Sequence, residues 1–247
     1  MSYVKGLALA TDKPWVGVNH LEGHLISPFL SETCAPIYPH IALIVSGGHT
    51  QLLQVLAWGH YELLGGTLDD AVGEAFDKVA KMLKLPYPGG PQIEVLARNG
   101  NPQSHALPRS MLESGDLSFS FSGLKTSVRV LLEKEPDILD SSERVADLCA
   151  SFQEAVIEVL TLKTRKALRS RGVRLLTLSG GVSCNQALVT SLREMCARES
   201  IRFLTATPRF STDNAAMIGA AGLLHLAAGR SSLWDQDVDP NLKLANG

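Results

Sequence analysis

The sequence predicts a mixed α/β fold, and three observations support this prediction. Two apolar runs, 41–45 and 174–178, are typical of strands buried on both faces of a sheet. Each run ends in a Ser-Gly-Gly turn, at residues 46–48 and 179–181. The longest helical pattern covers residues 142–171. The repeated turn is a faint internal similarity, which points to two related half-domains without forming a countable repeat.

The first half of the chain predicts short strands that alternate with helices. Residues 15–18 read as a short strand, and residues 51–58 resume after the first turn to complete a hairpin. A helix is expected over residues 67–84, with Thr67 as its N-cap and Asp70 at the capping-box position.

The second half continues the same mixture of strands, helices and loops. The proline- and glycine-rich residues 85–91 predict a loop, and a helix follows near residues 92–99. Alternating serine and phenylalanine over 117–121 predict a half-buried strand. Residues 201–206 form a last strand, which leads to a helix that starts near Asp213.

Composition indicates a globular protein of one large or two small domains. The chain has 247 residues, of which 45% are hydrophobic and 19% charged. Its longest nearly apolar stretch, 215–228, is too short to span a bilayer. No signal peptide is indicated, and four scattered cysteines predict neither a disulfide framework nor a thiolate zinc site. A cytoplasmic location is therefore expected.

The net charge of −2 does not indicate a nucleic-acid partner, but six cations gather near the end of the 142–171 helix. Two interpretations stay open, namely a solvated face with favourably placed cations and a patch that contacts a phosphate backbone. The six residues are Lys163, Arg165, Lys166, Arg169, Arg171 and Arg174.

A pair of histidines one helical turn apart, His20 and His24, predicts a metal site if Asp213 supplies a third ligand. Two imidazoles and a carboxylate leave coordination positions open, as in a working metal centre. The alternatives are an ordinary helix face for the pair and an N-cap for Asp213. Glu22 lies between the histidines, so the pattern differs from the His-Glu-x-x-His motif of zinc peptidases. No Ser/His/Asp or Cys/His triad is recognisable.

The two Ser-Gly-Gly turns predict phosphate binding as well as chain reversal. Glycines admit positive φ and let successive N–H groups point at one anion. The second turn also feeds a helix, whose N-terminus favours negative charge. Two such turns that face each other across a cleft would hold the phosphates of an adenine nucleotide. The alternative is that the glycines serve only to form the two turns.

Asp77 is a candidate acceptor for ribose or substrate hydroxyl groups. The alternative interpretation is an exposed acid that pairs with Lys78 or Lys81. Gly89 and Gly90 either approach a ligand closely or end a helix.

Three further polar residues are candidates for ligand contact. Glu94 is a possible extra acceptor, and Asn185 either bonds a base or ribose or caps its own helix. Lys125, after a Ser-Gly turn, is a candidate phosphate contact.

Seven segments in order together resemble the tRNA N6-adenosine threonylcarbamoyltransferase family in its bacterial or organellar form. The resemblance covers nearly the whole chain, from about Val4 to Gly222. The segments are VNHLEGHL, ALIVSGGHTQL, DDAVGEAFDKVAKML, YPGGPQIE, FSFSGLKT, LSGGVSCNQAL and FSTDNAAMIGAAG.

The resemblance implies the fold of the actin, sugar-kinase and heat-shock ATPase superfamily, with two related half-domains. It implies transfer of a threonylcarbamoyl group from threonylcarbamoyl-AMP, an adenylate derived from ATP, to N6 of the adenosine beside the anticodon, with AMP as the leaving group. The expected partners are tRNA that reads codons starting with A, a related inactive subunit and a small ATPase.

The resemblance also implies the site residues. One divalent metal, Fe2+ in preference to Zn2+, would bind His20, His24 and Asp213 and polarise the carbamoyl carbonyl. No catalytic residue separate from this site is implied. The implied adenylate and substrate contacts are Ile44, Val45, Ser46, Gly47, Gly48, Asp77, Gly90 and Asn185, with Glu94 where some members use an acid.

The chain departs from the family pattern at its start, where a strand hairpin and a Gly-Pro-Gly-rich segment are expected and absent. Residues 1–40 are therefore expected to be the remnant of an N-terminal half-domain that carries the histidine helix. Residues 41–230 would form the main domain, with a helical insertion, and 231–247 a loosely held polar tail. An uncovered sheet edge and apolar surface are expected, with reduced stability and activity.

Two other functions stay open. A small-molecule carbamoyltransferase of similar fold would share the histidine pair. An inactive nucleotide-binding remnant or partner subunit would typically lack that pair, which this chain has.

Overall fold

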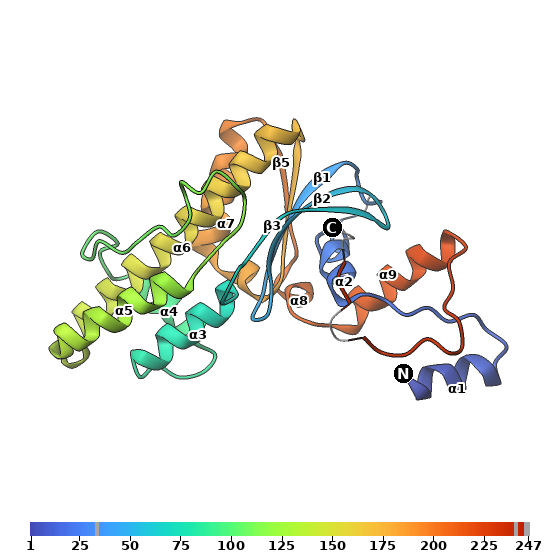
Figure 1. Cartoon of the computed structure of the whole chain (residues 1–247), viewed down its shortest axis with the longest axis horizontal. Coiled ribbons are helices and arrows are strands. Elements are labelled where there is room, and N and C mark those ends of the chain that lie inside the picture. The colour runs from blue at the N-terminus through green and yellow to red at the C-terminus, as the bar shows by residue number, and fades with distance from the viewer. Residues whose placement is uncertain (33–34, 240–241, 245–247) are drawn as a thin grey trace.

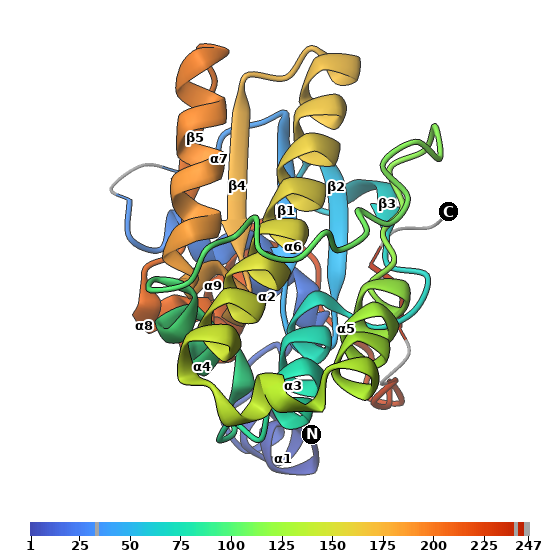
Figure 2. The same ribbon diagram turned by 90° about the vertical axis from the view of Figure 1, so that its left-hand side faces the viewer.

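A computed structural model describes residues 1–32, 35–239 and 242–244. One five-stranded sheet lies between two layers of helices (Figure 1). Figure 2, turned by 90°, shows the strands side by side behind α6. The predicted α/β class is confirmed. The strands are β1 His40–Val45, β2 Thr50–Ala57, β3 His60–Gly66, β4 Leu175–Ser179 and β5 Arg202–Thr205.

The sheet has the order β3-β2-β1-β4-β5. Strands β1, β2 and β3 form an antiparallel meander, while β1, β4 and β5 run parallel. The two central apolar strands, β1 and β4, are buried along their whole length, as predicted. Because they are parallel neighbours, their Ser-Gly-Gly turns lie side by side at one end of one sheet. The turns therefore belong to one sheet and do not mark two half-domains.

The helices fall into two layers, with α3 to α7 on one face of the sheet and α2 and α9 on the other (Figure 1). Helix α1 lies apart from the sheet, and short 3-10 turns cover residues 27–29, 136–140 and 181–184. The helices are α1 Ser2–Ala10, α2 His20–Ile26, α3 Val72–Met82, α4 Gly89–Ala97, α5 Ser122–Lys134, α6 Ser142–Arg171, α7 Gln186–Arg198, α8 Pro208–Ser211 and α9 Ala215–Ala227.

Strand β1 separates two hydrophobic cores, because successive side chains of a strand point to opposite faces. Ile41, Leu43 and Val45 belong to the large core under α3 to α7. Ala42 and Ile44 instead pack with Leu21 and Leu25 of α2. This second core fixes the helix that carries the histidine pair.

The strand predicted at 15–18 is not formed, because no neighbouring strand lies beside it in the described part of the chain. Its backbone partner is the tail, since Ser232 donates its N–H to the Trp15 carbonyl oxygen at 2.9 Å. Trp15 also packs against Trp234, and Lys5 donates to the Trp234 carbonyl oxygen. The prediction of a loosely held tail is therefore wrong for these residues.

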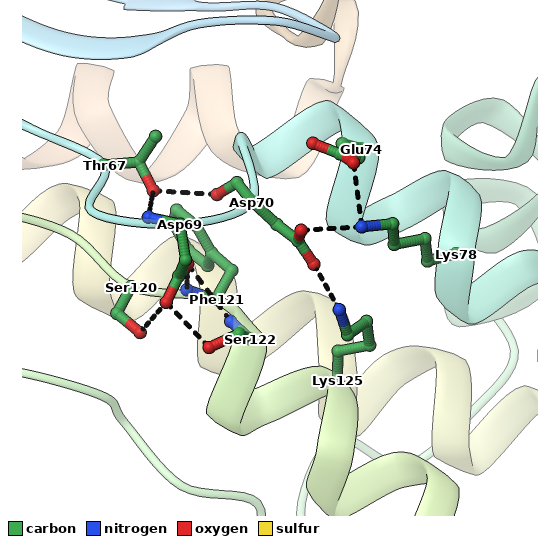
Figure 3. A network of polar contacts seen from close by, with 9 residues as sticks. All are labelled: Thr67, Asp69, Asp70, Glu74, Lys78, Ser120, Phe121, Ser122 and Lys125. Atoms are coloured by element: carbon green, nitrogen blue, oxygen red, sulfur yellow. Dashed lines mark hydrogen bonds and ion pairs between the residues drawn. The ribbon is translucent and has the colours of Figure 1, made fainter.

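The N-cap predicted at Thr67 is also wrong. Helix α3 begins only at Val72, whose N–H donates to the Thr50 hydroxyl at 2.8 Å. The Thr67 hydroxyl donates to the Asp70 carbonyl oxygen, so it holds the loop before the helix (Figure 3). Thr50 comes from β2, and this contact anchors the start of α3 to the sheet.

Segment 117–121 forms one isolated bridge, between Phe119 and Thr67, instead of the predicted strand. Its phenylalanines are fully buried, whereas Ser120 donates to Asp69 at 2.6 Å (Figure 3). The alternation of buried and polar side chains was thus correct. The segment crosses the end of β3, and among the described residues no partner strand continues the pairing.

No described helix is both long and apolar enough to cross a membrane. Cys149, Cys184 and Cys196 are free thiols, and Cys34 lies outside the described residues.

Candidate metal centre and nucleotide cavity

Helix α2 places His20 and His24 on one face, as their spacing predicts. Asn19 caps this helix, because its side-chain oxygen accepts from the Leu21 N–H at 2.9 Å. The Nε2 atoms of both histidines lie 3.3 Å from Oδ1 of Asp213. The structure thus brings together the three residues of the predicted metal site, with one potential ligand atom each within 4.8 Å.

Asp213 does not cap the following helix, which was the alternative interpretation. Asn214 takes that role, because its side-chain oxygen accepts from the Met217 N–H at 2.9 Å. The Asp213 side chain is 74% exposed and faces the two histidines. Its carboxylate is therefore available to a ligand.

His24 has the properties expected of a metal ligand. It is fully buried; its Nε2 lies 3.3 Å from the Asp213 carboxylate, and its Nδ1 forms no hydrogen bond with any described residue. Burial, assisted by the neighbouring His20, lowers the pKa of His24 to about 4. The imidazole is therefore neutral at neutral pH, the form that binds metals. A buried polar group without a close partner is rare, and a bound ion would satisfy Nε2.

His49 is a neighbour that the sequence analysis missed. It ends the turn after β1, where its N–H donates to the Ser46 hydroxyl at 3.0 Å. Its ring centroid lies 6.3 Å from that of His20. Burial, together with His20, lowers the pKa of His49. Its position directly after the first Ser-Gly-Gly turn was a signal that could have identified it.

A cavity of about 360 Å³ opens beside the two turns, within the size range of small-molecule sites. Tyr87 at its mouth is 85% exposed. The predicted residues that line the cavity are Gly47, Asp77, Gly90, Glu94 and Asn185. Gly181, from the second predicted turn, also lines the cavity, and the lining residues that sequence analysis missed include Gly73, Phe76, Tyr87, Val182 and Thr212.

The other predicted contacts do not line this cavity. Ile44 and Val45 have fully buried side chains within β1. Ser46 and Gly48 lie in the turn, where Ser46 accepts the His49 N–H instead.

The cavity and the histidine cluster adjoin each other. Gly47 lines the cavity two residues before His49, and Thr212 lines it one residue before Asp213. A ligand in the cavity can therefore extend towards the three candidate metal ligands.

The glycines of the two turns have different roles. Gly180 has φ +94°, and a Cβ there would lie 2.3 Å from the Val45 carbonyl oxygen, so close strand packing requires glycine. A Cβ on Gly47 or Gly48 would meet nothing within 4 Å, so their lack of side chains leaves space for a ligand. Gly73, at the start of α3, packs against Ser46.

The polar cavity residues are engaged in ways that the sequence left open. Asp77 Oδ1 accepts from the Gly89 N–H at 2.7 Å. The alternative, in which Asp77 pairs with Lys78 or Lys81 on the surface, is therefore not the observed arrangement. Asn185 caps α7 through the Leu188 N–H, and its amide also donates to Gln153.

Two further predicted ligand contacts, Glu94 and Lys125, also have protein partners. Glu94 accepts from the Gln186 N–H at 3.0 Å. The ammonium of Lys125 lies 2.6 Å from Asp70 (Figure 3), and Lys125 does not line the cavity.

Two other surface features lie outside the histidine cluster. A larger groove of about 630 Å³ between α4, α6 and α7 shares Glu94 with the cavity, but neither the histidines nor the glycine turns line it. The six cations of the basic cluster all have protein partners, which favours the interpretation of a structural face. Their partners are Ser114, Gly115 and Asp116 for the lysines, and Glu199 and Glu62 for the arginines.

The family model described as TsaD, tRNA N6-adenosine threonylcarbamoyltransferase, matches residues 1–220. Proteins of that name from Methylobacillus flagellatus and Geobacter sp. (strain M21) are 49% and 47% identical to this chain. The alignments cover 99% and 97% of this chain, and 71% and 69% of the relatives.

Among solved structures, T. kodakarensis HypF is similar in fold, with a TM-score of 0.65 at 17% identity. The match covers 92% of this chain but only 39% of HypF. Full-length HypF in a phosphate- and nucleotide-bound form gives the same TM-score at 13% identity, over 89% of this chain and 37% of HypF. These likenesses show a shared fold.

Proposed function

The chain belongs to the tRNA N6-adenosine threonylcarbamoyltransferase family, and from this premise we propose how its residues carry out the transfer. The family modifies tRNA, and its members are acyltransferases. In the proposed reaction, threonylcarbamoyl-AMP occupies the cavity and the adenosine N6 attacks its carbamoyl carbon. A C–N bond forms, the bond to the phosphate oxygen breaks, AMP leaves with that electron pair, and N6 loses a proton.

One observation carries the proposal, which is that the cavity adjoins a cluster of three metal-type side chains. Thr212 lines the cavity and Asp213, the next residue, faces the two histidines. This continuity allows the adenylate and the reacting carbonyl to occupy neighbouring positions.

The cavity residues bind and orient the adenylate. The open space above Gly47 and Gly48 allows phosphate to approach their backbone N–H groups. Asp77 is held by the Gly89 N–H and presents its carboxylate to hydroxyl groups. Tyr87 offers an aromatic face at the mouth, and Asn185, anchored to α7, forms a wall.

The residues His20, His24 and Asp213 would hold one divalent metal, for which Fe2+ is favoured and Zn2+ is possible. Such an ion supplies Lewis-acid polarisation of a carbonyl oxygen. The buried Nε2 atom of His24, which lies 3.3 Å from the carboxylate of Asp213, supports this assignment. The burial of His24 keeps the imidazole neutral, and the exposed Asp213 contributes negative charge on the solvent side.

The substrate and partners belong to the same proposal. We propose tRNA that reads codons starting with A as substrate, and a related inactive subunit and a small ATPase as partners. Membership of the actin, sugar-kinase and heat-shock ATPase superfamily is supported by the likeness to HypF. The division into 1–40, 41–230 and 231–247 stays a prediction.

Nucleoside mass spectrometry on unmodified tRNA tests the function. The tRNA is incubated with this chain, the partner proteins, ATP, threonine, bicarbonate and iron, beside a full-length relative as the control. Threonylcarbamoyladenosine that forms with this chain and is absent with His24→Ala is the expected result. An active control without product from this chain would contradict the proposal. AMP release that does not require tRNA would instead indicate a small-molecule carbamoyltransferase.

A further inference from the structure

We propose that Glu22, which lies between the two histidines in sequence, is a positioning residue that sets the geometry of the metal cluster. Its buried carboxylate ties the histidine helix α2 to α9 and to the β2–β3 hairpin. The inference rests on the metal centre proposed above and extends it to a residue that touches none of the three ligands.

The contacts of Glu22 form a closed hydrogen-bonded group. The residue is 6% exposed, and its Oε2 lies 2.8 Å from Nε2 of His225, on α9. Its Oε1 accepts from the hydroxyl of Tyr61, on β3, at 2.9 Å. That hydroxyl in turn accepts from the Gly59 N–H in the hairpin turn at 2.9 Å. Both carboxylate oxygens are thus satisfied by groups from two other elements.

The position of Glu22 on the helix determines what these bonds do. Two residues along an α-helix correspond to a rotation of about 200°, so Glu22 lies nearly opposite the ligand face of His20 and His24. Helix α2 has only seven residues, too few for it to be stable without tertiary contacts. Anchoring the side opposite the ligands fixes the rotation of the helix about its axis, and hence the direction of both imidazoles.

The same bonds fix the distance between the histidines and the carboxylate ligand. Asp213 precedes α9 by two residues, so its position follows that helix. Helix α2 contacts α9 closely, because a Cβ on Gly23 would lie 2.8 Å from Cγ of Met217. The Glu22–His225 bond adds a second contact two turns further along α9. These two contacts between α2 and α9 prevent one helix from rotating relative to the other.

A positioning role predicts a specific pattern in metal binding. Ligand groups that are not held in place bind a metal less tightly, and loss of such a support typically costs 10–100-fold in affinity. Glutamine at position 22 offers an oxygen that can accept from Tyr61 and an amide N–H that can donate to a ring nitrogen of His225, so it can preserve both contacts without the carboxylate charge. Alanine removes both bonds.

The test is a Co2+ titration of the whole chain, which follows the visible absorption of the bound ion and its Kd. Glu22→Ala is expected to raise the Kd about 10–100-fold and to change the absorption spectrum. Glu22→Gln is expected to stay within about threefold of wild type with an unchanged spectrum. Tyr61→Phe removes one of the two bonds, so it provides a milder variant if Glu22→Ala does not fold, with a smaller rise in Kd.

Asp69→Ala is the matched control. Asp69 is also a carboxylate with several hydrogen bonds, but its partners lie on the far side of the sheet from α2 (Figures 1 and 3). This variant should lose stability and keep the wild-type Kd.

Two contrary results have different meanings. Wild-type Kd and spectrum in Glu22→Ala would overturn the positioning role and leave the metal centre intact. Absence of Co2+ binding by the wild-type chain, or binding that survives His24→Ala, would overturn the metal centre itself.

Discussion

The histidine cluster and the aspartate network of Figure 3 are both polar groups at the junction of several elements, yet they differ in how far they are satisfied. In the network, each carboxylate oxygen of Asp69 and Asp70 has a partner. The partners are Ser120, Phe121 and Ser122 for Asp69, and Lys78 and Lys125 for Asp70. In the cluster, the Nδ1 atom of the buried His24 lacks a hydrogen bond with the described residues, and its Nε2 atom lies 3.3 Å from the largely exposed carboxylate of Asp213.

The pKa values show the same contrast. Partial burial raises the pKa of Asp69, but hydrogen bonds from two serines and two backbone N–H groups outweigh it and leave the pKa below its usual value. At His24 burial dominates, and the pKa falls to about 4. A satisfied network stabilises the fold, whereas an unsatisfied buried group indicates where an external ligand belongs.

Removing the imidazole of His24 should have the largest effect. His24→Ala deletes a ligand that the fold already holds in place, so Zn2+ affinity should fall by more than about 100-fold. Isothermal titration calorimetry measures this change, and circular dichroism verifies that the variant is folded. Zn2+ affinity within a few-fold of wild type would show that the cluster is not the metal centre.

Acidification should distinguish the two clusters. The pKa values of His24 and His40 are both lowered to about 4, chiefly by burial. The unfolded chain then binds more protons below pH 6.5, so the metal-free protein loses roughly 1.4 kcal/mol per pH unit for each histidine as pH falls from about 6.5 towards 4. The aspartates, whose folded pKa values are lowered, lose their contribution only below about pH 4.

Denaturant unfolding between pH 7.5 and 4.5 measures this dependence. His24→Ala should reduce the slope by about one proton. A slope identical to that of wild type would mean that His24 is already protonated in the folded chain.

Asp69→Ala should have a moderate effect on stability alone. It removes the acceptor of four hydrogen bonds, and because Asp69 is exposed the expected loss is only about 1–2 kcal/mol. Chemical denaturation measures this loss. A parallel change in Zn2+ affinity would show that the two clusters are coupled, contrary to our interpretation.

Lys125→Ala should have the smallest effect. Its ammonium neutralises Asp70 together with Lys78, so removal should cost less than about 1 kcal/mol and leave AMP binding unchanged. Equilibrium binding of AMP is the measurement. A clear loss of AMP affinity would restore the sequence-based hypothesis that Lys125 contacts phosphate.

The sequence predicted those features that depend only on residues near each other in the chain. The span 142–171 agrees with α6, because a long amphipathic helix with the Ser141 cap and Gly172 at its end carries its own signals. The buried strands β1 and β4 followed from continuous apolar runs. The histidine pair followed from helical spacing.

Features that depend on distant partners were not predictable in the same way. Residues 15–18 have strand composition, but their neighbour is the tail and not a strand. Thr67 has the pattern of an N-cap, but the hydroxyl of Thr50 binds the first helical N–H instead. Placement of the two turns side by side required knowledge of strand order, which no local pattern contains. The lining residues Tyr87 and Thr212 could be identified only from the structure, which places them at the cavity.

X-ray absorption spectroscopy of the Zn2+-loaded chain tests the central claim most directly, because it reads the atoms bound to the metal. We predict two imidazole nitrogens at about 2.0–2.1 Å, with the remaining ligands oxygen and no sulfur. His24→Ala should remove one imidazole contribution. A shell that contains sulfur at about 2.3 Å, or one without imidazole, would contradict the assignment of His20, His24 and Asp213 as the metal centre.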